Sequence, residues 1–74
     1  MNENDSTKRN EDDFLAQDIG SDIKRLSNLL TRRAGHLAET NFDREQLRNA
    51  LPELKELAAN ILTGIGAWEY ILSE

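Results

Sequence analysis

The chain has 74 residues, of which 38% are hydrophobic and 31% are charged, and its formal net charge is −5. This length allows one small domain, because a short chain hides little of its surface when it folds. The chain has no cysteine, which excludes a disulfide framework and a cysteine-ligated zinc site, and it has no run of about 18 apolar residues that could span a membrane.

The first 13 residues form a polar segment whose only apolar side chain is Met1. A segment of this composition cannot bury enough apolar surface to offset the entropy that it would lose on ordering. We therefore predict that residues 1–13 are a disordered acidic tail. The segment also lacks the apolar stretch of a secretory signal, so the expected location is the cytoplasm.

Residues 14–74 are predicted to form an all-α domain. Leucine, alanine and isoleucine dominate this part of the chain, valine is absent, and no stretch alternates apolar and polar residues as a half-buried strand would. An apolar stripe with helical spacing predicts a first helix over about 14–39. Its members are Leu15, Ile19, Ile23, Leu26, Leu30, Ala34 and Leu37.

A turn is predicted over residues 40–43, followed by a second helix over about 44–73. Asp43 and Gln46 have the spacing of a capping box, in which the first side chain accepts a hydrogen bond from the start of the helix. Phe42 precedes this cap and is expected to pack on Leu47. Two long helices joined by so short a turn run antiparallel, so the predicted fold is a helical hairpin.

The second helix has an unbroken seam of apolar residues spaced alternately four and three apart. Pro52 interrupts this helix, because proline lacks a backbone donor and clashes with the preceding turn. The helix is therefore either kinked at Pro52 or broken into two, and the undisturbed spacing favours the kink. The seam consists of Leu47, Leu51, Leu54, Ala58, Ile61, Ile65, Trp68 and Leu72, with Ala50, Leu57, Gly64 and Ile71 beside it.

Pairing the two stripes around the turn predicts a register in which Leu15 lies opposite Trp68, and Gly20 lies opposite Gly64. Each stripe is too wide for one opposing helix to cover. We therefore expect two hairpins to form a homodimeric four-helix bundle, or another protein to cover the remaining apolar surface. The residues expected in the core or dimer seam are Ile19, Ile23, Leu26, Leu30, Leu54, Leu57, Ile61, Ile65 and Trp68.

The sequence predicts no catalytic, cofactor-binding or metal-binding residues. The only histidine, His36, falls near the end of the first helix, where a solvated imidazole is the expected state. Gly64 and Gly66 lack the third glycine, the preceding strand and the lysine of a phosphate-binding loop. We therefore expect a protein that is not an enzyme and holds no cofactor.

The outer side of the first helix is expected to carry a basic stripe, although the chain as a whole is acidic, and the stripe consists of Lys24, Arg25, Arg32 and Arg33. We expect a small adaptor, chaperone or inhibitor that binds a protein partner stoichiometrically, with nucleic-acid binding by the basic stripe as the alternative. The architecture resembles that of helical-hairpin dimers among small phage and plasmid regulators, and architecture by itself carries no function. The residues expected to contact a partner are Arg25, Arg32, Arg33, Leu62 and Tyr70.

Overall fold

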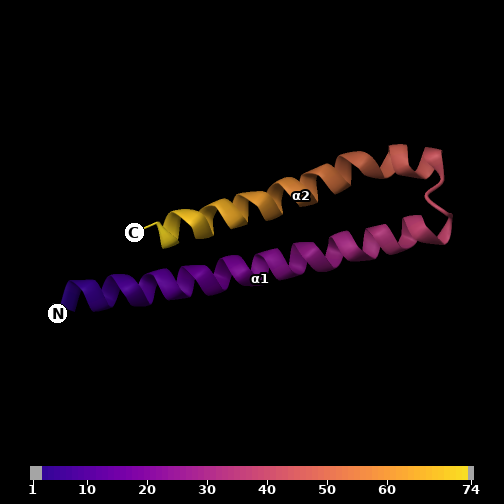
Figure 1. Cartoon of the computed structure of the whole chain (residues 1–74). Helices are drawn as coiled ribbons and strands as arrows, with labels where there is room; N and C mark the ends of the chain where they lie inside the picture. Colours follow the sequence, from indigo (N-terminus) through magenta and orange to yellow (C-terminus); the bar gives the residue numbers. More distant parts are fainter. Residues whose placement is uncertain (1–2, 74) are drawn as a thin grey trace.

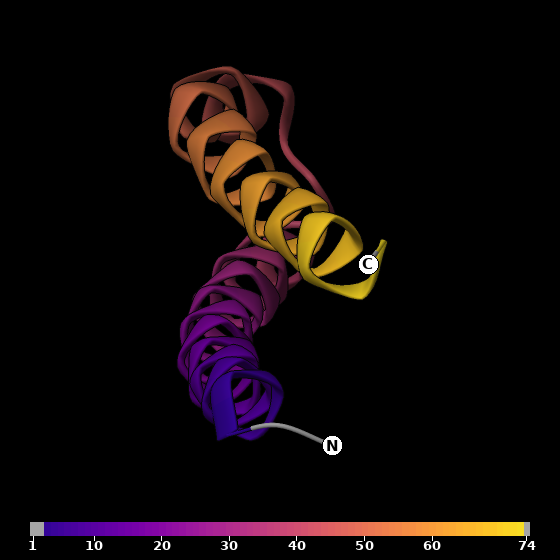
Figure 2. The ribbon, with the colours of Figure 1, turned by 90° about the vertical axis from the view of Figure 1, so that its left-hand side faces the viewer.

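Two long helices form an antiparallel hairpin in the computed structural model, which describes the backbone of residues 3–73 and the side chains of residues 11–73. Helix α1 spans Glu3–Glu39 and helix α2 spans Arg44–Leu72, and the two lie side by side (Figure 1). The molecule is a rod of 59 × 15 × 12 Å, and the view along it shows a single pair of helices (Figure 2). The predicted all-α hairpin is therefore confirmed.

The start of α1 differs from the sequence prediction. The helix begins at Glu3, whereas the sequence predicts a disordered tail over 1–13 and a helix from about residue 14. This first part of α1 projects past the end of α2 (Figure 1). A helix without tertiary packing has only its own backbone hydrogen bonds and is marginal in water, so disorder of the segment stays a prediction. Residues 1–2 of the predicted tail and residue 74 of the predicted domain lie outside the described residues.

Deleting residues 1–12 is expected to leave the far-ultraviolet circular dichroism per molecule nearly unchanged, because the deletion removes no packed helix. The free energy of unfolding is expected to change by less than about 0.5 kcal/mol, as for other surface changes away from a core. Both quantities follow from urea unfolding at matched molar concentration. A loss of signal equal to that of a helix over residues 3–12 would show that the segment holds its helix in solution.

The turn begins with a Schellman motif at the end of α1. The Phe42 N–H donates to the Leu37 carbonyl at 2.8 Å, and the Asn41 N–H donates to the Ala38 carbonyl at 3.0 Å. Asn41 and Phe42 have φ values of 55° and 57°. Asparagine adopts this left-handed conformation more readily than most residues, which explains why α1 ends here and the chain reverses direction.

The turn closes with the predicted N-cap of α2. The Asp43 carboxylate accepts a hydrogen bond from the Gln46 N–H at 3.3 Å, which confirms the first half of the capping box. The Gln46 side-chain oxygen accepts instead from the Thr40 hydroxyl at 3.1 Å, so this side chain ties the start of α2 to the end of α1.

Removing the cap with Asp43→Ala is expected to lower the free energy of unfolding by about 1 kcal/mol, because the start of α2 loses its side-chain acceptor. Urea unfolding followed by circular dichroism measures the change. Asp43→Asn is the matched control, since it keeps an accepting oxygen and loses only the charge. If Asp43→Asn costs as much as Asp43→Ala, the stabilising effect comes from the charge and not from the hydrogen bond.

Pro52 lies inside α2, which continues on both sides of it as one helix from Arg44 to Leu72. Of the two alternatives, a break into two helices is therefore wrong, and a kink at this residue stays a prediction. Proline cannot donate a hydrogen bond to the carbonyl of Arg48, four residues earlier. The helix therefore contains a local defect at an exposed position.

Only half of the residues in the predicted seam of α2 pack on α1. Leu54, Ile61 and Trp68 are at least half-buried as expected, and Leu57 is buried at 8% exposed. Leu47 is also half-buried, whereas the remaining members of the heptad seam are exposed, and the row beside them packs on α1 instead. That packed row consists of Ala50, Leu57, Gly64 and Ile71, and the exposed row consists of Leu51, Ala58, Ile65 and Leu72.

Small residues explain this choice of rows. A Cβ atom added to Gly64 would lie 2.9 Å from Cγ1 of Ile23, so the missing side chain is what lets α1 approach. A Cβ atom added to Gly20 would lie 3.3 Å from Cζ2 of Trp68. The Trp68 indole N–H also donates to the Ala16 carbonyl at 3.1 Å. Each glycine thus receives a large side chain from the other helix, in the manner of a ridge packing into a groove.

These contacts correct the predicted register. Trp68 lies against Gly20 and Ala16 and not opposite Leu15, which is 52% exposed. The two glycines do not face each other, because Gly64 faces Ile23. Trp68 therefore meets α1 one to five residues beyond its predicted partner Leu15, and Gly64 lies between Ile19 and Ile23, within one turn of the predicted Gly20.

Candidate functional site

One face of α2 presents a continuous set of exposed apolar side chains, which we name the α2 stripe. Its apolar members Leu51, Leu62, Ile65 and Leu72 are 48%, 68%, 37% and 81% exposed, and Ala58 between them is also exposed. Lys55 and Glu69 are charged and occupy the two remaining positions of the same helical spacing. In order, the α2 stripe consists of Leu51, Lys55, Ala58, Leu62, Ile65, Glu69 and Leu72.

The hairpin has almost no interior of its own. Leu37 and Leu57 are the buried hydrophobic residues of its core, at 7% and 8% exposed. The chain exposes 6139 Å², whereas a compact monomer of this mass exposes roughly 4600 Å². Its radius of gyration is 17.4 Å, against about 11 Å for a compact domain of the same length. Part of this excess belongs to the projecting start of α1, and the uncovered face of α2 contributes to the rest.

The predicted basic residues of α1 do not share one environment. Arg33 turns toward α2 and donates from Nε to the Glu53 carboxylate at 3.0 Å. Arg25 lies 3.7 Å from the Asp22 carboxylate one turn earlier on the same helix. A shallow surface depression of about 360 Å³, which we name the α1 depression, is lined by the other basic residues of the basic stripe. It is lined by Ser21, Lys24, Arg25, Asn28, Leu29 and Arg32.

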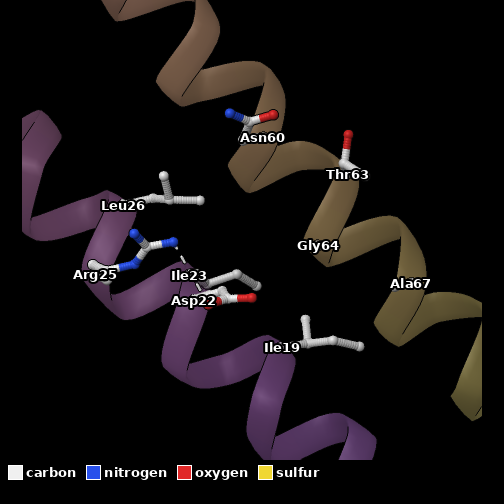
Figure 3. A pocket seen from close by; sticks show the side chains of 9 residues that line it. All are labelled: Ile19, Asp22, Ile23, Arg25, Leu26, Asn60, Thr63, Gly64 and Ala67. Atoms are coloured by element: carbon white, nitrogen blue, oxygen red, sulfur yellow. Dashed lines mark ion pairs between the residues drawn. The ribbon is translucent and has the colours of Figure 1, made fainter.

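A second depression, of about 370 Å³, lies between the helices beside Gly64 (Figure 3). Apolar side chains of α1 point toward α2 across it, and the ion pair between Asp22 and Arg25 lies on its α1 side. The Thr63 hydroxyl at its rim donates to the Ala59 carbonyl at 2.9 Å. Its lining contains no histidine or cysteine.

A third depression, of about 330 Å³, is almost entirely apolar and lies near the open end of the hairpin. Trp68, Ile71 and Leu72 line it from α2, and Ala16 and Gln17 line it from α1. Leu72 is also the last member of the α2 stripe. The stripe therefore ends in a hollow and not on a flat surface.

The structure separates the five residues expected to contact a partner. Leu62 belongs to the α2 stripe, and Tyr70 lies outside it at 75% exposed. Arg25 and Arg32 share the α1 depression, whereas Arg33 pairs with Glu53. The sequence prediction places Leu51, Ile65 and Leu72 in the apolar seam, with Ile65 in the core or dimer seam, and does not name them as partner contacts because their spacing also fits packing within the hairpin.

Among the side chains that the structure describes, no group of three or more His, Cys, Asp or Glu residues could hold a metal ion. Within residues 3–73, neither helix is both long and apolar enough to cross a membrane. No protein-family model matches the chain, and neither the curated proteins nor the solved structures include a match to it.

Proposed function

We propose that the chain is a non-catalytic interaction module that forms a homodimeric four-helix bundle and binds a protein partner stoichiometrically. The observation that carries this proposal is that Leu37 and Leu57 are the buried hydrophobic residues among side chains 11–73, whereas four large aliphatic side chains of α2 are exposed. Each such side chain left in water forgoes about 1.5–3 kcal/mol of burial. That sum is comparable to the whole stability of a small domain, so the apolar face needs a cover.

The area supports a protein as the cover. The chain exposes 6139 Å², which is roughly 1500 Å² more than a compact monomer of its mass, and the projecting start of α1 accounts for part of this excess. A stable protein interface buries about 800 Å² on each partner. Pairing of two hairpins is the simplest way to bury such an area, because twofold dimers are the most common oligomers and four-helix bundles are a stable packing of helices. We propose the cytoplasm as the cellular location of the protein.

The solution mass tests the homodimer. Light scattering behind a sizing column is expected to give twice the chain mass over a range of concentrations. A mass equal to one chain at all concentrations would contradict the homodimer and would mean that another protein covers the apolar face.

Retention of a protein by a tagged copy of the chain tests the partner. Wild type is expected to retain one stoichiometric protein. Tyr70→Ala, and separately Arg25→Glu with Arg32→Glu, are expected to release it. Retention by all variants would contradict these contacts.

The α1 depression favours nucleic-acid binding as a second candidate function. It gathers Lys24, Arg25 and Arg32 with the amide of Asn28, and a twofold dimer would present it twice. Against this candidate, the chain carries a net charge of −5, and Arg25 already has a carboxylate neighbour.

If nucleic acid binds there, a mobility shift is expected at low salt and is expected to weaken steeply as salt rises, because phosphate contacts release counterions. Arg25→Glu with Arg32→Glu is expected to abolish the shift. The matched control is Arg44→Glu with Arg48→Glu, which changes the net charge equally at α2. Absence of a shift of wild type at low salt contradicts nucleic-acid binding, and equal loss in both double variants shows a general charge effect.

A further inference from the structure

The α2 stripe places residues of complementary charge and size at corresponding positions on the two sides of Leu62. Its residues are spaced alternately four and three apart, which places them on one face with the spacing of a coiled-coil seam. Leu62 is at the centre of the stripe and a leucine stands at each end. Ala58 and Ile65 flank the centre, and Lys55 and Glu69 stand at matching distances on either side of it.

We infer that the α2 stripe packs antiparallel on the same stripe of a second copy of this chain, about a twofold axis that passes beside Leu62. This inference rests on the homodimer proposed above and specifies its contact. Leu62 meets Leu62 of the second copy, and Leu51 meets Leu72 of the second copy. Ala58 meets Ile65 of the second copy, and Lys55 meets Glu69 of the second copy. Each contact other than the central one occurs twice, as an isologous interface requires.

Charge and size both favour antiparallel pairing of two copies of the stripe. The only charged residues in the stripe have opposite signs, and antiparallel pairing brings each one to its opposite. Parallel pairing would instead bring Lys55 to Lys55 and Glu69 to Glu69, which is repulsive. The small Ala58 stands opposite the larger Ile65, so large and small side chains alternate across the contact.

The hollow at the open end fits the same geometry. Leu72, at 81% exposed, forms one wall of the apolar depression that Trp68 and Ile71 also line. In the antiparallel pair, Leu51 of the second copy approaches Leu72 and therefore reaches this depression. Both the most exposed residue of the stripe and its adjoining hollow are then covered by one leucine.

A charge-exchange experiment tests the pairing on the full chain. Lys55→Glu and Glu69→Lys are each expected to raise the dimer dissociation constant by about tenfold or more, because each creates two like-charge contacts. Combining them is expected to bring the constant back to within about threefold of wild type. Sedimentation equilibrium measures these constants. Lys24→Glu and Glu56→Lys are the matched controls, since they change the net charge equally outside the stripe and are expected to leave the constant nearly unchanged.

The outcomes separate this contact from the proposed homodimer. A wild-type chain that is monomeric at all concentrations overturns both. A dimer that is unaffected by either charge reversal, or that the double exchange fails to restore, overturns the antiparallel pairing and leaves the homodimer standing.

Cross-linking gives an independent readout that does not depend on stability. The chain has no cysteine, so Leu62→Cys introduces a single thiol. Two such thiols lie together at the twofold axis, and oxidation is expected to convert most of the protein to a disulfide-linked dimer, because the Cβ atoms fall near disulfide distance. Ala59→Cys, at an exposed position outside the stripe, is the control and is expected to cross-link poorly. Equal or better cross-linking by Ala59→Cys overturns the pairing.

Discussion

Replacing Gly64 by leucine is expected to destabilise the hairpin by about 2–3 kcal/mol, because overpacking of a close contact forces the backbone apart. A single Cβ atom at this position would already lie 2.9 Å from Cγ1 and 3.0 Å from Cδ1 of Ile23. A leucine adds three further carbon atoms in the same place. Thermal and urea unfolding by circular dichroism measure the loss, which corresponds to about 4–8 °C in Tm for each kcal/mol.

Gly66 provides the matched control, since it lies in the same helix two residues later and nothing lies within 4 Å of an added Cβ atom. Gly66→Leu is expected to stabilise the chain by about 0.5–1 kcal/mol through helix propensity alone. Equal shifts of the two variants in the same direction would show that Gly64 is not a packing position.

A gentler pair of variants covers the case in which Gly64→Leu fails to fold. Gly64→Ala combines a helix-propensity gain of about 1 kcal/mol with the short contact to Ile23, and a net loss is expected. In an Ile23→Ala background the short contact is absent, so Gly64→Ala is expected to become stabilising. A double-mutant cycle measures the coupling between the two positions. Coupling close to zero would contradict the close approach of the helices at this point.

Pro52→Ala is expected to raise the free energy of unfolding by about 2–3 kcal/mol, because alanine restores a backbone donor and relieves the clash with the preceding turn. The gain is large because Pro52 lies in the interior of α2 and not in its first turn. Urea unfolding measures it. The side chain is exposed, so little packing is lost in the exchange.

Ala59→Pro is the reciprocal variant, seven residues later and also exposed in α2. It is expected to destabilise the chain by roughly 3 kcal/mol or more. If Pro52→Ala proves neutral while Ala59→Pro is severe, Pro52 occupies a helix start in solution, where its missing donor costs nothing.

Local patterns in the sequence were sufficient to predict the helices, the turn and the cap. The Asp43 cap and the end of α1 at Glu39 depend on residues close in sequence, and residue types such as aspartate and asparagine are typical of these positions. The hairpin then follows from the short connection. The start of α1 was not predicted, because a polar segment carries no apolar spacing that marks a helix boundary.

The choice between two rows of α2 could not be made from spacing. Leu54 and Ile61 belong to the packed seam whether the row beside them is the one with Leu57 and Gly64 or the one with Leu51 and Ile65. The choice depends on how closely α1 can approach, and that depends on which glycine meets which large side chain across the hairpin. Spacing along one helix does not contain this information.

For the same reason, the sequence alone does not show which residues of the candidate site share a surface. Arg32 and Arg33 are neighbours in sequence, yet only Arg33 reaches Glu53, because successive helical residues point about 100° apart. Leu62 was recognised as surplus to the seam. The spacing of Leu51, Ile65 and Leu72 also fits a seam between helices, so the sequence alone does not show that they form a surface with Leu62.

The contact of Trp68 with Gly20 and Ala16 gives the molecule a built-in optical reporter. Trp68 is the only tryptophan in the chain, and its indole is half-buried and hydrogen-bonded across the open end of the hairpin. Selectively excited tryptophan fluorescence therefore follows the separation of the two helix ends, while circular dichroism follows the whole helical content. If the two signals change together during unfolding, the hairpin opens as one unit; a fluorescence change that comes first marks fraying from the end opposite the turn.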